Sequence, residues 1–272
     1  MFTGILQVSG TPFRLDDIVA ISIIFLIIIG CAIHFIREII YGRRGQRWNI
    51  EFEETKRYDK VQIIIHWLFL ILLFALLLTG LFIFKNDYFI LLYPPLDEIN
   101  LRLLVAYHWY ISIALLDLAI IHIFYDSIII KKIGSAWITK LDITNLLTIT
   151  KNFFVITKDY PKMKKLHPMQ KIFHLGLVIV IFLLGFTGLT IWEPFLTFLR
   201  NIGFGSIENW LNIYESHYLH DLLTFILIAL MIGHFYFSVL VPTNWKVFRG
   251  MTHGQLLDKN KTSKEKAIKF DD

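Results

Sequence analysis

Five apolar runs, each long enough to cross a lipid bilayer, dominate this sequence. They cover Ile18–Ile36, Val61–Phe84, Leu103–Ile130, Ile172–Trp192 and Ser216–Val241. A helix needs about 20 mainly apolar residues to span the hydrocarbon core, and only a helix or a closed barrel satisfies its backbone there. Hydrophobic residues make up 56% of the 272 positions, far more than in an ordinary soluble domain. The predicted fold class is therefore all-α, a polytopic membrane helix bundle.

The segments between the runs alternate in charge, which predicts the orientation in the membrane. Residues 43–60 carry six Lys or Arg and residues 131–165 carry eight, whereas 85–102 and 193–215 carry more acidic than basic residues. The positive-inside rule then places the N-terminus outside and the C-terminus in the cytoplasm. The charges before the first run are Arg14 and two aspartates, whereas four arginines follow it, so this run is predicted to remain as an anchor and not to be cleaved. The net charge of +5 belongs to this asymmetry and does not indicate nucleic-acid binding.

The second half of the chain repeats the first half weakly. LLLTGLFIF at 76–84 resembles LGFTGLTIW at 184–192, and in both copies a histidine precedes the glycine by fourteen positions. The next run in each copy carries two histidines that are also fourteen positions apart. Fourteen residues are about four helical turns, so such a pair leaves one face roughly 21 Å apart along the axis. The residues are His66 with Gly80, His174 with Gly188, His108 with His122, and His220 with His234.

The depth of these histidines in the membrane suggests two stacked haems. His108 and His220 lie near the outer face and form a matched pair. His234 lies near the inner face, and His66, His122 and His174 lie at the same depth, so each of these three could be its partner. The repeat favours His122, because it gives a symmetric pair. Two neutral imidazoles are a common axial ligand set for a b haem, and the other nitrogen of each ring needs a hydrogen-bond partner.

The cysteine content and the glycines agree with this interpretation. Cys31 is the single cysteine, so neither a disulfide framework nor a thiolate-held iron–sulfur cluster is available, and no Cys-x-x-Cys-His motif is present to attach haem covalently. Gly80 and Gly188 remove side chains where a porphyrin would approach. His174 is predicted to be a buried residue or a quinone neighbour.

Several segments resemble the gamma subunit of membrane-bound formate dehydrogenase and related di-haem cytochrome b subunits of hydrogenases and thiosulfate reductases. They are Arg57-Tyr58-Asp59, His66-Trp67, Thr79-Gly80, His108, Gln170-Lys171, Thr187-Gly188 and His220-(x13)-His234-Phe-Tyr. The resemblance implies a four-helix core at 56–250 that holds two b haems, the outer by His108 and His220 and the inner by His66 and His234. Residues 1–55 then form an extra N-terminal transmembrane anchor with a cytoplasmic loop, and 251–272 form a cytoplasmic tail.

The same resemblance implies a site for menaquinone or ubiquinone at the cytoplasmic start of the fourth run. Its residues are His167, Gln170, Lys171 and His174, although His167 and Met169 depart from the family motif.

The predicted function is that of a membrane-anchor cytochrome b subunit of a respiratory complex in the prokaryotic cytoplasmic membrane. It would connect an extracytoplasmic iron–sulfur or cytochrome c subunit, and through it a catalytic subunit, to the quinone pool. The loops are too short to hold a catalytic domain, and the sequence leaves the direction of electron flow open. The alternative is a haem-free transporter or structural anchor whose histidines serve proton or metal passage.

Overall fold

The computed structural model describes residues 15–43, 58–84, 98–131, 134, 137–155, 168–204, 213–241 and 245–254. All regular secondary structure in these ranges is helical. Five helices in them are long and apolar enough to cross a membrane, which confirms the predicted all-α membrane fold. They are α1 (Leu15–Arg43), α2 (Lys60–Phe84), α4 (Glu98–Phe124), α6 (Pro168–Ile191) and α8 (Ile213–Phe235).

The contacts divide the chain into two units. One unit comprises residues 56–135 and 250–256, and so contains α2, α4 and the π-helical turn η1 (Tyr125–Ile129). The other comprises residues 1–55, 136–249 and 257–272, with α1, α5 (Lys140–Val155), α6, α7 (Glu193–Asn201), α8 and the π-helical turn η4 (Tyr236–Leu240). The boundary between the units falls within α9 (Trp245–His253).

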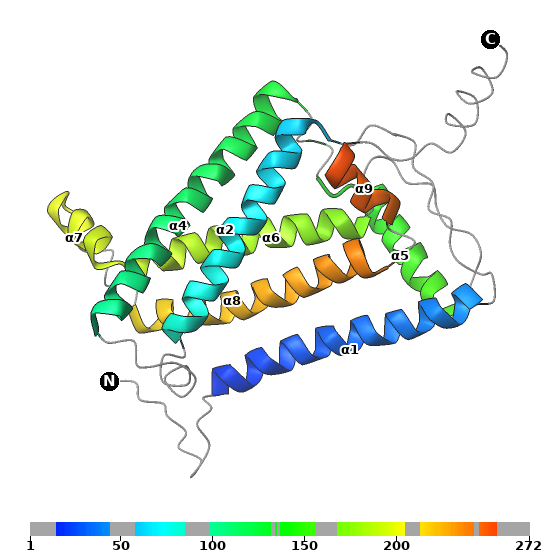
Figure 1. Cartoon of the computed structure of the whole chain (residues 1–272), viewed down its shortest axis with the longest axis horizontal. Helices are drawn as coiled ribbons and strands as arrows, with labels where there is room; N and C mark the ends of the chain where they lie inside the picture. The colour runs from blue at the N-terminus through cyan, green and yellow to red at the C-terminus, as the bar shows by residue number, and fades with distance from the viewer. Residues whose placement is uncertain are drawn as a thin grey trace. The chain divides into compact units, whose positions relative to one another are not determined.

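In the smaller unit, α2 and α4 form an antiparallel hairpin (Figure 1). Gly254 follows α9 and has a φ of +74°. Its carbonyl oxygen accepts a hydrogen bond from the Tyr58 N–H, with 3.3 Å between nitrogen and oxygen. A Cβ on Gly254 would lie 2.6 Å from the Tyr58 carbonyl oxygen, so both the backbone angle and the close approach require glycine here. The indole N–H of Trp67 donates to the Met251 carbonyl at 3.2 Å, which ties the same segment to α2.

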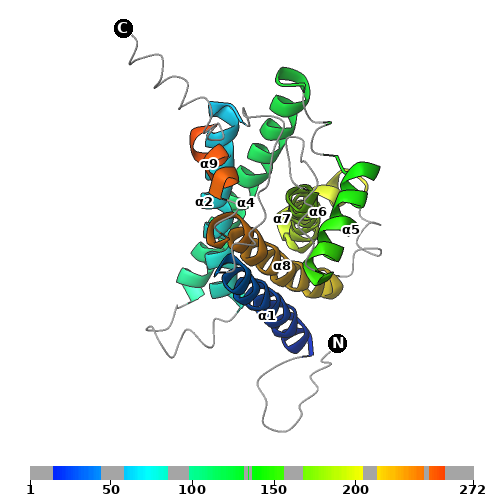
Figure 2. The ribbon, with the colours of Figure 1, turned by 90° about the vertical axis from the view of Figure 1, so that its right-hand side faces the viewer.

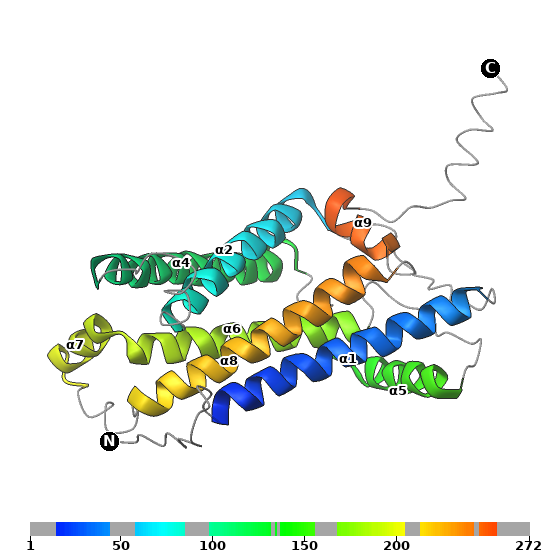
Figure 3. The same cartoon turned by 60° about the horizontal axis from the view of Figure 1, so that its bottom comes forward.

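In the larger unit, α8 lies between α6 and α1 (Figure 3). The helix α6 is antiparallel to α8, whereas α1 runs parallel to it (Figure 1). The side chains of Leu223, Leu227 and Ala229 on α8 are buried, with 2 to 5% of their surface exposed. Helix α5 lies beside the first turns of α6 (Figure 2).

Prolines set two of the boundaries in this unit. Pro168 is the first residue of α6, where a missing N–H costs no hydrogen bond. At the other end of α6, Pro194 has no N–H with which to continue the helix, so the chain turns at the extended residue Trp192 and α7 begins.

Candidate functional site

The histidine near the start of α4 is held by a hydroxyl of α2. Oγ1 of Thr79 lies 2.8 Å from Nδ1 of His108, and it also lies 2.9 Å from the Ala75 carbonyl and 3.1 Å from the Leu76 carbonyl. A hydroxyl has one proton to donate. When the hydroxyl proton goes to the backbone carbonyls, the hydroxyl oxygen accepts the Nδ1 proton of His108. The Nε2 atom then carries the lone pair, which is the form of imidazole that binds a metal.

The same contact recurs in the larger unit between α6 and α8. Oγ1 of Thr187 lies 2.9 Å from Nδ1 of His220 and donates to the carbonyls of Leu183 at 2.9 Å and Leu184 at 3.2 Å. One turn after each histidine, a hydroxyl donates to the histidine's own carbonyl, from Ser112 at 2.7 Å and from Thr224 at 2.9 Å. The two copies of the sequence repeat therefore build the same local arrangement.

Gly80 and Gly188 lie next to these imidazole rings. A Cβ on Gly80 would lie 3.2 Å from Cε1 of His108, and a Cβ on Gly188 would lie 3.6 Å from Cε1 of His220. Gly80 thus allows the His108 ring to sit close against the neighbouring helix, whereas a Cβ at Gly188 would make only an ordinary contact with the His220 ring. In each copy the threonine one position earlier holds the ring. A neutral, oriented imidazole beside a position without a side chain suits axial ligation of haem, so the residues present fit this cofactor.

The remaining histidines of the predicted set lie on the expected helices. His66 is half-buried on α2, and His122 is half-buried near the end of α4, where its Nε2 lies 3.6 Å from Oδ2 of Asp126. His174 lies on α6 and His234 on α8. Each of the predicted pairs, His108 with His220 and His66 with His234, has one member in each unit, so the pairing stays a prediction.

One π-helical turn follows His122, and another follows His234. The turn η1 begins three residues after His122, and its Tyr125 carbonyl accepts from the Ile130 N–H at 2.9 Å. The turn η4 begins two residues after His234, and its Tyr236 carbonyl accepts from the Val241 N–H at 3.2 Å. Isolated π turns are rare and occur frequently at functional sites. This duplication is a second structural sign of the repeat.

A polar network lies beside His122 in the smaller unit. The Gln62 amide donates to Oδ1 of Asp126 at 2.8 Å, and the Tyr125 hydroxyl donates to Oδ2 of Asp59 at 3.1 Å. Asp59 and Gln62 also cap the start of α2 through reciprocal bonds between side chain and backbone, of 2.9 and 3.3 Å. The ends of α2 and α4 are therefore joined by hydrogen bonds close to one of the two candidates for the inner ligand.

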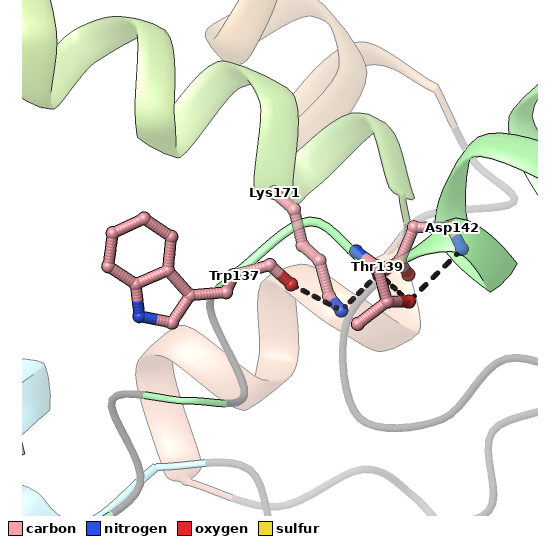
Figure 4. A network of polar contacts seen from close by, with 4 residues as sticks. All are labelled: Trp137, Thr139, Asp142 and Lys171. Carbon is pink, nitrogen blue, oxygen red and sulfur yellow. Dashed lines mark hydrogen bonds and ion pairs between the residues drawn. The ribbon is translucent and has the colours of Figure 1, made fainter.

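The start of α6 contains three of the four residues predicted to bind quinone. His167 lies outside the described residues, while Gln170, Lys171 and His174 lie on the first two turns. Lys171 is buried, and its Nζ lies 2.7 Å from Oδ2 of Asp142 on α5 and 3.3 Å from the Trp137 carbonyl (Figure 4). Thr139 also donates to Oδ2 of Asp142, from its N–H at 2.8 Å and from its hydroxyl at 2.7 Å. The ion pair fastens α5 to α6.

The carboxyl of Asp142 is held in its charged form. Burial by itself raises the pKa of Asp142, but the hydrogen bonds from Lys171 and Thr139, together with the Lys171 charge, outweigh burial and lower it.

A second ion pair, between Glu193 and Arg200 on α7, is exposed to water, with Nη1 of Arg200 2.9 Å from Oε1 of Glu193. The hydrogen bond from Arg200 lowers the pKa of Glu193.

Sequence reasoning missed three groups of residues. In the sequence Thr79 and Thr187 stand out only as parts of a motif, although in both copies a Thr-Gly dipeptide, with its glycine fourteen positions after a histidine, is a usable signal. No motif in the sequence signals the contact of Asp142 with Lys171. His34 would be assigned most simply to the surface, but it is half-buried between α1 and α8.

The spanning helices and their threonine-held histidines together indicate a class of protein. Apolar spanning helices that hold histidines by Nδ1, in a chain without a Cys-x-x-Cys-His motif, are typical of membrane cytochromes of b type. The chain belongs to the prokaryotic cytochrome b561 family, whose model matches residues 57–254. It is therefore a multi-pass membrane electron-transfer protein that binds haem b. This membership favours the cytochrome over the haem-free alternative. A comparison with curated proteins gives no match.

Proposed function

We propose that the chain is the membrane cytochrome b subunit of a respiratory oxidoreductase complex and that it binds two b haems. The observation that carries the proposal is the duplicated hydrogen bond of Thr79 to His108 and of Thr187 to His220. Each copy holds one histidine by the same kind of hydrogen bond, and the sequence predicts equal depth for the two, so one haem with a ligand from each copy fits this pattern. The outer haem would be ligated by His108 and His220, and the inner haem by His66 and His234.

When bound, the haem iron would supply one-electron transfer. The protein's own residues would orient the ligands. Thr79 and Thr187 would fix the tautomer and the plane of the His108 and His220 rings, and such hydrogen-bond partners tune the redox potential of a bound metal.

The quinone site would lie at the start of α6, with His167, Gln170, Lys171 and His174 around it, and would take menaquinone or ubiquinone. A lysine ammonium has three N–H donors, and Asp142 and the Trp137 carbonyl take two of those of Lys171. The third could donate to a quinone carbonyl. The predicted orientation puts this end at the cytoplasmic face, where protons are available from water, and the resemblance to formate dehydrogenase gamma subunits supports the same location.

The partners would bind at the opposite face. With the N-terminus outside, the ends of α2 and α6 and the start of α8 face the extracytoplasmic side, where an iron–sulfur or cytochrome c subunit would exchange electrons with the outer haem and with a catalytic subunit. The charge asymmetry of the loops supports this orientation.

A haem assay tests the proposal. Protein purified from haem-replete cells should contain close to two haems per chain by the pyridine haemochrome method. His220→Ala should lose one of them, whereas the matched control His217→Ala, an exposed histidine one turn earlier on α8, should keep both. A haem-free parent, or equal loss in both variants, would contradict the proposal.

A further inference from the structure

The first helix, α1, lies outside the region that the family model matches, yet it packs along α8. Most of its surface faces away from the unit and is apolar, as expected of a helix in lipid: Phe25, Leu26, Ile33 and Ile36 are each more than half exposed. A helix that served only as an anchor would need nothing else. The part of α1 that faces α8 has a different composition.

A polar stripe runs along that face near the cytoplasmic end of α1. Cys31, His34 and Glu38 are spaced three and four positions apart and so share one face of the helix. Glu38 is buried, with 8% of its surface exposed, and His34 is half-buried. Ionisable groups within a membrane-spanning helix are costly and are usually retained for a function.

The stripe contacts α8 at the turn that follows His234. A hydrogen bond of 2.8 Å joins Nδ1 of His34 to Oη of Tyr236, the first residue of η4. The His34 ring also packs edge-on against the rings of Tyr236 and Phe237, with centroids 5.7 and 5.2 Å apart. Tyr236 is buried, with 5% of its surface exposed.

The contacts continue from this turn to the backbone beside His234. The ring of Phe237 packs against that of Phe173 on α6, with centroids 6.0 Å apart. The Phe173 ring in turn lies 3.0 Å from where a Cβ on Gly233 would stand, so it presses directly on the residue before His234. A continuous set of ring contacts therefore runs from His34 to both sides of His234.

We propose that α1 is part of the redox core, and that His34 is a positioning residue that holds the π turn at Tyr236 and thereby orients His234 as a haem ligand. This inference rests on the proposed ligation of the inner haem by His234. Partners of a ligating histidine and the packing around it set the orientation of the ring and tune the potential of the metal. A π turn has weaker helical constraints than an α turn, so an external hydrogen bond is well placed to fix it.

The test uses the full-length protein and two conservative variants, His34→Phe and Tyr236→Phe. Each removes the hydrogen bond and keeps an aromatic ring in the packing. Tyr110→Phe is the matched control, because it removes a hydroxyl from a membrane tyrosine that is 70% exposed on α4. The readouts are haem content, the low-spin EPR signals of the oxidised protein and a potentiometric titration. The variants His234→Ala and His108→Ala assign the inner and outer components.

Both test variants should shift the EPR signal and the midpoint potential of the inner component, or lower its occupancy selectively, while the outer component and the Tyr110→Phe control match the parent. If both components of His34→Phe and Tyr236→Phe superimpose on those of the parent, or if both components change equally, the positioning role is wrong. A parent without haem, or a His234→Ala variant that retains both haems, would instead reject the proposed function, so the two failures are distinguishable.

Discussion

Thr187 and His220 are joined across α6 and α8 by a hydrogen bond of 2.9 Å between Oγ1 and Nδ1. The corresponding bond of Thr79 and His108 joins α2 and α4 at 2.8 Å. Because each threonine hydroxyl already donates to the carbonyls of its own helix, both histidines are set in the same tautomer. The duplicated sequence motif thus gives two histidines, one in each helical hairpin, the same hydrogen-bond partner at Nδ1.

The first prediction concerns these two hydroxyls. Thr187→Val keeps the size of the side chain but removes the acceptor for the Nδ1 proton of His220, so the ring should lose its fixed orientation. Loss of such a partner typically lowers metal affinity by about 10- to 100-fold. We expect faster haem loss to a haem-scavenging protein for Thr187→Val, measured by absorption, while one haem is retained. Thr144→Val on α5, whose hydroxyl donates to the Lys140 carbonyl of its own helix, is the control and should behave as the parent.

The second prediction separates the two glycines. A Cβ on Gly80 would stand 3.2 Å from the His108 ring, tighter than ordinary contact, whereas the distance at Gly188 to the His220 ring is 3.6 Å. Gly80→Ala should therefore displace its histidine and alter the haem spectrum more than Gly188→Ala does. Alanine also favours a helix by up to about 1 kcal/mol, so thermal stability alone should not fall by much. Equal spectra for the two variants would show that the glycines act in some other way.

The fold was largely predictable because membrane insertion imposes a simple rule on sequence. Runs such as Val61–Phe84 have to be apolar over their whole length, and the structure has α2 at Lys60–Phe84. The histidine spacing was equally readable, because fourteen residues return to nearly the same helix face. These features depend on one helix at a time.

The supporting contacts were harder to predict because they depend on how two helices are rotated against each other. The sequence shows that Thr79 and His108 exist, but only the packing of α2 on α4 brings Oγ1 to Nδ1. Similarly, Asp142 and Lys171 are 29 positions apart, and their ion pair requires α5 to return to the start of α6. The spacing of Cys31, His34 and Glu38 in the sequence predicts a shared face of α1. The sequence does not show that this face contacts Tyr236.

The third prediction decides between the two candidates for the inner ligand. His66→Ala should remove the inner haem and leave the outer one, because only α8 contributes to both proposed sites. His122→Ala should retain both haems, since its Nε2 lies 3.6 Å from the Asp126 carboxylate and the ring serves the network at the ends of α2 and α4. Haem content and the reduced-minus-oxidised spectrum measure both. Should His122→Ala lose the inner haem while His66→Ala keeps it, the symmetric pair of His122 and His234 is correct.

The fourth prediction concerns the ion pair that fastens α5. Asp142→Asn leaves the buried ammonium of Lys171 without its counter-charge, and breaking a buried pair in this way costs about 3 kcal/mol. The double variant Asp142→Leu with Lys171→Met removes both charges and should recover much of that loss. Glu193→Gln, which breaks the exposed pair on α7, should change the melting temperature in detergent little. A melting temperature for Asp142→Asn equal to that of the parent would show that the pair does not hold α5.

The same pair predicts a pH dependence of stability. Since the pKa of Asp142 is lower in the folded protein than its ordinary value of about 4, the carboxylate stabilises the fold fully above that value. This stabilisation is lost as the pH falls through the lowered pKa. The difference in melting temperature between the parent and Asp142→Asn should therefore be constant from pH 7 to 5 and shrink below about pH 4.

The fifth prediction tests the quinone site at the start of α6. Single replacement of His167, Gln170 or His174 by Ala should slow reoxidation of the inner haem by a soluble quinone analogue and leave both haem spectra nearly unchanged, because none of the three is a proposed ligand. A quinone needs an apolar slot for its ring and a few directed donors for its carbonyls. Gln170 and His174 are four residues apart and share one face of α6, so they could serve one carbonyl together. Thr148→Ala on α5, whose hydroxyl donates to the Thr144 carbonyl of its own helix, is the control. Parental reoxidation rates in all three variants would place the quinone elsewhere, most simply beside the outer haem.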